Sequence, residues 1–304
     1  MIELQASHFT ELCGEATVSE RLGALEGERR DAVRKFWTRG LIGTALSIAA
    51  LLSLLASGWT AAAAIVAVLF FVCTCAAAAG PLMAAGEGLK LPVLDALAKR
   101  CSLEYIADGF TPPAYARARP LLFGSLTSES FTDLFHGADD EGRGYAVYEA
   151  CLQRRVGKNT STIFSGQVYA IHRRPEHGKG GTTVIVPDRS IFNFFKPASD
   201  MEGVRIEGDE EFEKRFEVYS TAPMEAKQLL FSSTLRRHLL DLRKAGGISV
   251  FISPEEALVA ANSKNRFEPG SMLRRRPGEE RVKAMFDDVA ASLETLKALR
   301  AELG

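Results

Sequence analysis

The sequence predicts an α+β protein, in which a mainly antiparallel sheet with flanking helices is tethered by an N-terminal transmembrane helical hairpin. Three observations lead to this prediction. A run from Gly40 to Gly86 contains no Asp, Glu, Lys, Arg or His, although 25% of the chain is charged. The middle of the chain alternates apolar and polar residues between turn-forming segments, which is typical of strands. The last part of the chain returns to the apolar spacing of helices.

The uncharged run is long enough for two crossings of a bilayer, because about 20 apolar residues span the roughly 30 Å hydrocarbon core. Turn-forming and interfacial residues interrupt it at Ser57-Gly58-Trp59-Thr60. We therefore expect helices at 41–56 and 61–79, the second ending near Gly80-Pro81 or extending toward Ala85. A buried hairpin of a soluble protein would carry a polar stripe, which neither segment has. A signal peptide would begin near the N-terminus. A hairpin that enters the bilayer without crossing remains an alternative, because the first segment is short.

Cations flank the uncharged run on both sides, whereas the turn inside it has none. The positive-inside rule therefore predicts that both flanks and both termini are cytoplasmic. Trp37, Arg39 and Trp59 are the residues expected at the membrane interfaces. The cations that set this orientation are Arg29, Arg30, Arg34, Lys35 and Arg39 before the run, and Lys90, Lys99 and Arg100 after it.

The chain is expected to have four parts. Residues 1–39 form a cytoplasmic amphipathic helix, residues 40–86 the hairpin, and residues 87–112 a connector. Pro112-Pro113 breaks the chain near the start of the α+β domain, which we place at 113–304.

Strands are expected first in the middle of this domain. Two turns, at 157–160 and 175–181, separate strand-like runs and indicate a meander of hairpin-linked strands. The expected strands are 131–135, 145–153, 162–172 and 182–186, with later ones at 204–206 and 216–219.

Helices and two further strands complete the domain. Residues 224–230 and 235–244 are expected to be helical, the latter capped by Ser232 or Ser233 and stopped by Gly246-Gly247. Strands follow at 248–252 and 257–261. The last helix, 279–303, carries one apolar face that we assign to core packing rather than to a coiled-coil seam. That face consists of Val282, Met285, Phe286, Val289, Leu293 and Leu296.

No motif indicates a reaction, a metal or a cofactor. The Gly157-Lys158-Asn159 turn lacks the upstream glycine and the following Ser or Thr of a phosphate-binding loop, and it joins two strands. The five histidines are scattered, and no cysteine or carboxylate cluster completes a metal site. Asp139, Asp140 and Glu141 are interpreted as a solvated loop. The five cysteines, odd in number, are expected to be reduced.

Basic residues gather at the predicted turns. If these turns face an anionic membrane surface, each cation contributes about 1 kcal/mol to binding. The candidate contacts for lipid headgroups or another anionic ligand are Arg154, Arg155 and Lys158 at the first turn, and Arg173, Arg174 and Lys179 at the second. Arg274, Arg275 and Arg276 form a third basic group.

Several segments together resemble a bacterial family catalogued as a domain of unknown function, family thirty-one thirty-seven. The segments are Val147–Arg155, Thr162–Gly166 and Glu211–Ser220, preceded by the two membrane segments. The resemblance extends over most of the chain after residue 35. It implies a bacterial protein of the inner (cytoplasmic) membrane, and it supplies no active site.

The leading functional hypothesis is a membrane-anchored cytoplasmic binding or scaffold module. One alternative is an enzyme or lipid-handling protein whose site is assembled from dispersed residues. A third reading is a subunit of a larger inner-membrane complex. The expected partners are the lipid bilayer and, in the third reading, another membrane protein or a second copy of the chain. A net charge of −1 gives no support for nucleic-acid binding.

Overall fold

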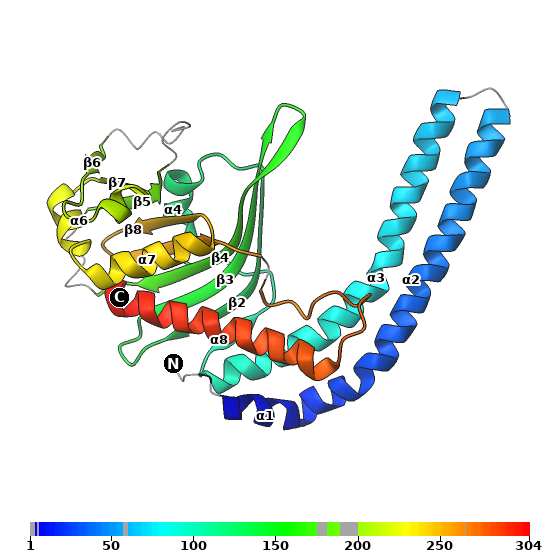
Figure 1. Cartoon of the computed structure of the whole chain (residues 1–304), viewed down its shortest axis with the longest axis horizontal. Coiled ribbons are helices and arrows are strands. Elements are labelled where there is room, and N and C mark those ends of the chain that lie inside the picture. The colour runs from blue at the N-terminus through cyan, green and yellow to red at the C-terminus, as the bar shows by residue number, and fades with distance from the viewer. Residues whose placement is uncertain (1–3, 5, 57–59, 175–180, 189–199, 265) are drawn as a thin grey trace. The chain divides into compact units, whose positions relative to one another are not determined.

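The computed structural model describes residues 4, 6–56, 60–174, 181–188, 200–264 and 266–304. The chain divides into two compact units (Figure 1). We call Gln5–Leu97 with Phe267–Asp287 the hairpin unit, and we call the remainder, mainly Ala98–Arg266 with Asp288–Gly304, the sheet unit. The architecture is α+β, with two long apolar N-terminal helices followed by a nine-stranded antiparallel sheet and its helices, as the sequence predicts.

The hairpin unit is built on two long helices that run side by side (Figure 1). A short helix, α1 (Ala6–Gly14), precedes α2 (Ala16–Ala56) and α3 (Thr60–Arg100). The expected N-terminal helix and the first apolar segment are thus one continuous helix. The predicted end of the second helix, at Gly80-Pro81 or toward Ala85, is wrong, because α3 continues through Pro81 and Pro92 to Arg100. Beyond Pro81, the side chains of Leu89, Leu94 and Leu97 are buried.

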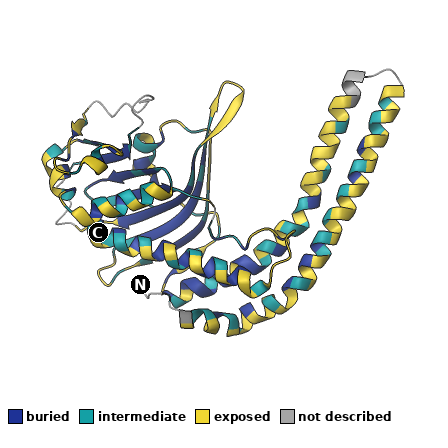
Figure 2. Cartoon of the chain, in the orientation of Figure 1, coloured by how far each residue is buried: buried dark blue, intermediate teal, exposed yellow. Residues whose placement is uncertain are grey.

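Both α2 and α3 are long and apolar enough to cross a membrane. Their apolar halves are exposed in the structure (Figure 2), with Leu41 67% and Ile65 62% accessible. A continuous apolar surface of this size is typical of a membrane or interaction region. The two helices approach closely at Gly43, where an added Cβ would lie 2.0 Å from Cγ2 of Thr74.

Among the described residues, the sheet unit contains nine antiparallel strands in the order β1-β2-β3-β4-β9-β8-β5-β7-β6. The first three long strands form the predicted meander. The strands are β1 (Glu104–Ile106), β2 (Ser128–Ala138), β3 (Gly144–Val156), β4 (Asn159–His172), β5 (Thr183–Pro187), β6 (Glu202–Val204), β7 (Phe216–Ser220), β8 (Ile248–Ile252) and β9 (Glu256–Asn262).

The predicted continuation of the meander into β5 is wrong. The free edge of β4 pairs with β9, from Gly166 opposite Asn262 to His172 opposite Glu256, so β9 and β8 lie between β4 and β5. Turn-forming residues do not indicate which distant strand pairs with the edge of β4. The turn signals at 175–181 therefore could not predict the pairing with β9. Most of that loop lies outside the described residues.

Different helices cover the two faces of the sheet. A short helix absent from our expectations, α4 (Tyr115–Leu122), packs on one face over β5 and β8. We call this the α4 face. On the other face lie α7 (Ser233–Ala245) and the end of α8 (Gly278–Leu303) (Figure 1). Two further helices, α5 (Glu210–Glu213) and α6 (Pro223–Leu229), pack near β6 and β7.

Alternation along the strands assigns side chains to the two faces. Tyr148, Leu152 and Val168 belong to the apolar core of the α4 face. Their neighbour Gln167 points the other way and donates through Nε2 to the Ser292 hydroxyl of α8, at 2.8 Å.

The C-terminal helices match the sequence predictions closely. Ser232 caps α7 by accepting a hydrogen bond from the Leu235 amide at 3.2 Å. The predicted apolar face of α8 is buried, which confirms its assignment to core packing. Its six residues, Val282, Met285, Phe286, Val289, Leu293 and Leu296, are each 5% exposed or less.

Candidate functional site

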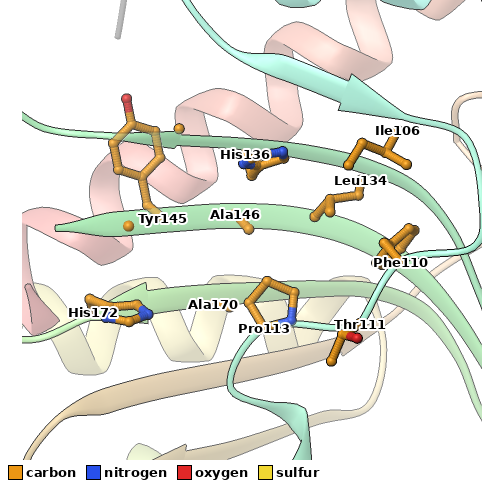
Figure 3. Close-up of a pocket in the computed structure, with 12 residues that line it drawn as sticks. Ile106, Phe110, Thr111, Pro113, Leu134, His136, Tyr145, Ala146, Ala170 and His172 are labelled. Atoms are coloured by element: carbon orange, nitrogen blue, oxygen red, sulfur yellow. The ribbon is translucent and has the colours of Figure 1, made fainter. Parts of the chain in front are cut away.

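The sheet unit contains a cleft of about 350 Å³ on its α4 face (Figure 3). One wall is the segment that leads from β1 toward α4 and carries Phe110 and Pro113. The other wall is the sheet itself, where Leu134 of β2, Ala146 of β3 and Ala170 of β4 lie side by side. The volume falls within the range of roughly 300–1,000 Å³ that is usual for ligand pockets.

Small residues in otherwise bulky strands create the cleft. Ala146 and Ala170 are direct partners in the β3–β4 register, and Gly144 lies two residues before Ala146. Residues two apart on a strand share a face, so all three lie beneath the same space. A Cβ added at Gly144 would meet the Cδ2 atom of His172 at 3.5 Å, an ordinary contact distance.

The segment above the cleft is held by the sheet. The hydroxyl of Tyr148 donates to the Pro113 carbonyl at 3.1 Å. The rings of Phe110 and Tyr148 meet edge to face, with centroids 5.9 Å apart. The cleft is therefore bounded by a segment tied to β3.

Two histidines are the principal polar groups of the cleft. His136 lies on β2, with its Nε2 atom 3.4 Å from Oε2 of Glu104, and His172 ends β4. The strand β3 separates them, and they are two residues out of register, so their backbones are about 12 Å apart. Figure 3 shows the two imidazoles apart from each other along the cleft. They do not converge on one atom.

Charged side chains flank His172 on its other side. A second hollow, of about 530 Å³, is lined by His172, Arg117 and Pro112, together with Glu255 and Glu256. The Arg117 guanidinium is paired with Glu255 and lies 3.8 Å from Glu256. His172 lines both spaces, so a polar opening adjoins an apolar cleft.

Three of the six predicted basic contacts, Arg154, Arg155 and Arg173, form hydrogen bonds within the protein. Arg154 donates to the backbone carbonyls of Phe123 and Ser125. Arg155 donates to the Gly157 carbonyl across its own turn, at 3.3 Å. These bonds involve two of the six side chains that we had proposed for headgroup contact.

Arg173, at the other end of β4, is also bonded to the protein. It donates to the carbonyls of Ser253 at 2.7 Å and Leu303 at 3.1 Å, and burial lowers the pKa of its guanidinium. Arg174 follows it at the end of β4, and Lys179 lies outside the described residues.

The two predicted basic groups do not form one surface. Lys158 precedes β4 and Arg173 follows it, and the strand between them has 14 residues. At about 3.3 Å per residue, the two groups are about 45 Å apart along the strand.

The predicted interface residues belong to the hairpin unit. Trp37 is 60% exposed. Arg39 donates to the Ala77 carbonyl at 3.1 Å, across the two helices. Trp59 lies outside the described residues.

The acidic loop is part of an ion-pair network. Asp139 accepts from Arg143 of its own loop and from Arg300 of α8, the latter at 2.7 Å. Partial burial acts to raise the pKa of Asp139, but hydrogen bonds from the Arg143 amide, the Arg143 guanidinium and Arg300 outweigh it, so the pKa lies well below its usual range. Within the described part of the chain, no three His, Cys, Asp or Glu side chains are grouped to hold a metal.

One family description matches the chain. A family described as a protein of unknown function (DUF3137) matches residues 162–300, a shorter stretch than the resemblance after residue 35 that we expected. The comparisons with curated proteins and with solved structures found no match.

The matched stretch includes part of the candidate cleft and a motif with a structural role. It begins in β4 and ends in α8, so it contains Ala170 and His172 but not the cleft residues of β1–β3. Within it, Gly166 lies where β4 meets β9, and an added Cβ would approach the Ala261 carbonyl oxygen to 2.2 Å. The Thr162–Gly166 motif therefore reflects strand packing.

Sequence reasoning did not identify the cleft. Its walls come from four separate segments around residues 106–113, 134–137, 144–146 and 170–172. The one local signal was the succession of small residues, Gly144 and Ala146 on one strand and Ala170 on the next, and its meaning depends on strand register.

Proposed function

We propose that the protein is a membrane-anchored binding module whose apolar cleft receives an elongated apolar molecule with a polar end. The apolar cleft on the α4 face carries this proposal. Its walls are mainly aliphatic or aromatic, and the polar groups Arg117, Glu255 and Glu256 adjoin one end next to His172. Ligand pockets commonly combine an apolar lining with a few polar groups that fix orientation.

The location that we propose is the inner membrane of a bacterium, with both termini in the cytoplasm. Two helices long and apolar enough to span the bilayer support the anchor. The cations on both flanks of the uncharged run support the orientation.

Binding is favoured over catalysis by the arrangement of the polar groups. His136 and His172 are separated by a strand, and Arg117 is engaged by two carboxylates. A general acid and base acting on one substrate would have to reach the same reacting atoms. The same apolar cleft also favours the lipid-handling alternative, because a lipid chain is an elongated apolar ligand. Crosslinking with a fatty acid tests it.

The test is photocrosslinking with a fatty acid that carries a diazirine on its chain. The full-length protein in nanodiscs would be irradiated with this probe, and the crosslinked peptides would be mapped by mass spectrometry. We expect labels on the peptides that contain residues 106–113 and 144–146, in addition to labels on the apolar parts of α2 and α3.

A variant that fills the cleft makes this test specific. Gly144→Leu adds a side chain over the cleft floor, where the first added atom makes only ordinary contacts. It should reduce labelling of the cleft peptides at least fivefold without changing labelling of the membrane helices. Gly203→Leu on β6 is the matched control, because no atom lies within 4 Å of its Cβ position. Equal cleft labelling in wild type and Gly144→Leu would contradict the proposal.

A further inference from the structure

The hairpin unit contains a second feature that the cleft does not involve. The loop of residues 267–277, which we call the clasp loop, folds against α3. Phe267 and Met272 are buried. At Gly86 of α3, an added Cβ would lie 3.8 Å from atoms of both Met272 and Pro269. The clasp loop therefore contacts α3 at the last residue of the uncharged run.

Buried cations hold the clasp loop in place. Arg281, 1% exposed, donates to the carbonyls of Pro269 at 2.8 Å, Ser271 at 3.2 Å and Arg274 at 2.7 Å. Hydrogen bonds from a guanidinium to several carbonyls are charge-assisted and fix the backbone that supplies them.

Two further cations of the hairpin unit reach the clasp loop from the long helices. Lys90 of α3 pairs with Glu268 at 2.8 Å. Arg29 of α2 reaches the Met272 carbonyl at 3.5 Å. The loop is thus attached to both helices of the hairpin.

The outer side of the clasp loop presents an apolar residue followed by three cations. Leu273 is 45% exposed, and Arg274, Arg275 and Arg276 are exposed as well. Arg276 is partly engaged by Glu280, at 3.3 Å. Arg274 accepts the Arg281 hydrogen bond through its backbone carbonyl, so its exposed guanidinium takes no part in that bond.

The position of this surface along the helices matches the edge of a bilayer. The expected membrane segment of α3 ends near Gly80, and Gly86 is six residues further along the helix, or about 9 Å. The headgroup layer is about 5–7 Å thick on each side of the hydrocarbon core. Long basic side chains extend toward such a layer. Electrostatic attraction also acts over a Debye length of about 8 Å.

We propose that the clasp loop binds the headgroups of anionic phospholipids. Leu273 enters the interface, and Arg274 and Arg275 pair with headgroup phosphates, with Arg276 contributing less because of Glu280. This inference assumes that the hairpin crosses the membrane, as proposed above, but it does not depend on the cleft. In this proposal, the cations that contact lipid lie on the clasp loop and not on the strand turns.

The test compares lipid retention by full-length variants. Each protein would be extracted from nanodiscs that contain phosphatidylethanolamine and phosphatidylglycerol, and the retained lipids would be counted by native mass spectrometry. The test variant is Arg274→Gln/Arg275→Gln/Arg276→Gln. The matched control is Arg154→Gln/Arg155→Gln/Lys158→Gln, which removes the same charge from the β3–β4 turn.

We expect wild type and control to retain phosphatidylglycerol in preference to phosphatidylethanolamine. In the test variant, the ratio of retained phosphatidylglycerol to phosphatidylethanolamine should fall at least threefold. An unchanged preference in the test variant would overturn the proposal. So would a loss confined to the control variant, which would place the lipid contact on the sheet unit.

A second measurement locates the loop directly. Leu273→Trp, in a background with Trp37→Phe and Trp59→Phe, should be quenched by a nitroxide on the lipid headgroup. Val156→Trp at the β3–β4 turn, 64% exposed in the native chain, serves as the comparison. Weaker quenching of Leu273→Trp than of Val156→Trp would overturn the proposal even if the lipid counts agreed with it.

Discussion

At the scale of single residues, the carboxylate of Asp139 forms ion pairs that hold the fold together. Asp139 was interpreted from the sequence as part of a solvated acidic loop, because Asp140 and Glu141 follow it. The structure instead pairs it with Arg143 and Arg300. The partner in α8 is distant along the chain, so the pairing is visible only in three dimensions. The guanidinium of Arg300 also stacks on Tyr145, 4.5 Å from the ring centroid.

This network predicts a pH-dependent contribution to stability. The pKa of Asp139 is lower in the folded chain than its unfolded value near 3.9. Its contribution is therefore present above about pH 4 and is lost as the pH falls toward the folded pKa. Asp139→Asn should lower the thermal unfolding temperature at pH 7, and the difference from wild type should narrow steadily below about pH 4.

The measurement is thermal unfolding of the full chain in nanodiscs across this pH range. Asp140→Asn is the control, since Asp140 is exposed on the same loop. Equal unfolding temperatures for the two variants at pH 7 would refute the stabilising role of Asp139.

At the scale of elements, the helices of the hairpin depend on a glycine. The side chain of Thr74 occupies the space that a Cβ of Gly43 would need. Small residues at such positions let membrane helices approach closely, where packing stabilises the pair. Ser47, one turn further along α2, is also buried, and its hydroxyl donates to the Gly43 carbonyl at 2.7 Å.

Gly43→Leu is therefore expected to separate the helices locally. The cost should be about 1–3 kcal/mol of unfolding free energy, as for other overpacked sites. Thermal unfolding in nanodiscs measures it as a lower transition temperature. Gly40→Leu lies one turn away with no atom within 4 Å of its Cβ position, and it should be close to neutral. Similar transitions for the two variants would show that Gly43 is not a packing site.

At the scale of the whole molecule, the two units have different surfaces. The hairpin unit exposes its apolar halves, whereas the sheet unit buries a core on each face of its sheet. A chain that combines these surfaces is expected to reside at a membrane, with the apolar helices in the bilayer. The membrane orientation is therefore the prediction that belongs to this scale.

The orientation is tested by cysteine labelling of intact cells. In a chain whose five native cysteines are replaced by serine or alanine, Ser57→Cys should react with a membrane-impermeant maleimide from the outside. Gly304→Cys should react only after the cells are opened, because both termini are expected in the cytoplasm. Labelling of Gly304→Cys in intact cells would refute the proposed orientation.

The sequence by itself determined the features that depend on local pattern. The absence of charge from Gly40 to Gly86 predicted the apolar hairpin, because burying a charge in a bilayer is costly. Alternation predicted β2, β3 and β4, and the spacing of Val282 to Leu296 predicted the buried face of α8. A serine cap at 232 or 233 was predicted because a serine hydroxyl has a fixed local role at a helix start, and the structure shows that Ser232 is the cap.

Only the tertiary structure decided the features that depend on contacts between distant segments. The insertion of β9 and β8 beside β4 follows from edge pairing. The helix α3 continues through Pro81 into a segment whose leucines are buried. The cleft exists because Ala146 and Ala170 meet in register opposite the segment that carries Phe110 and Pro113. The clasp loop is fixed by Arg281, whose carbonyl partners come from the loop it closes. In each case, the stabilising contacts join groups that are distant in the sequence and meet only on folding. Local sequence patterns therefore cannot predict them.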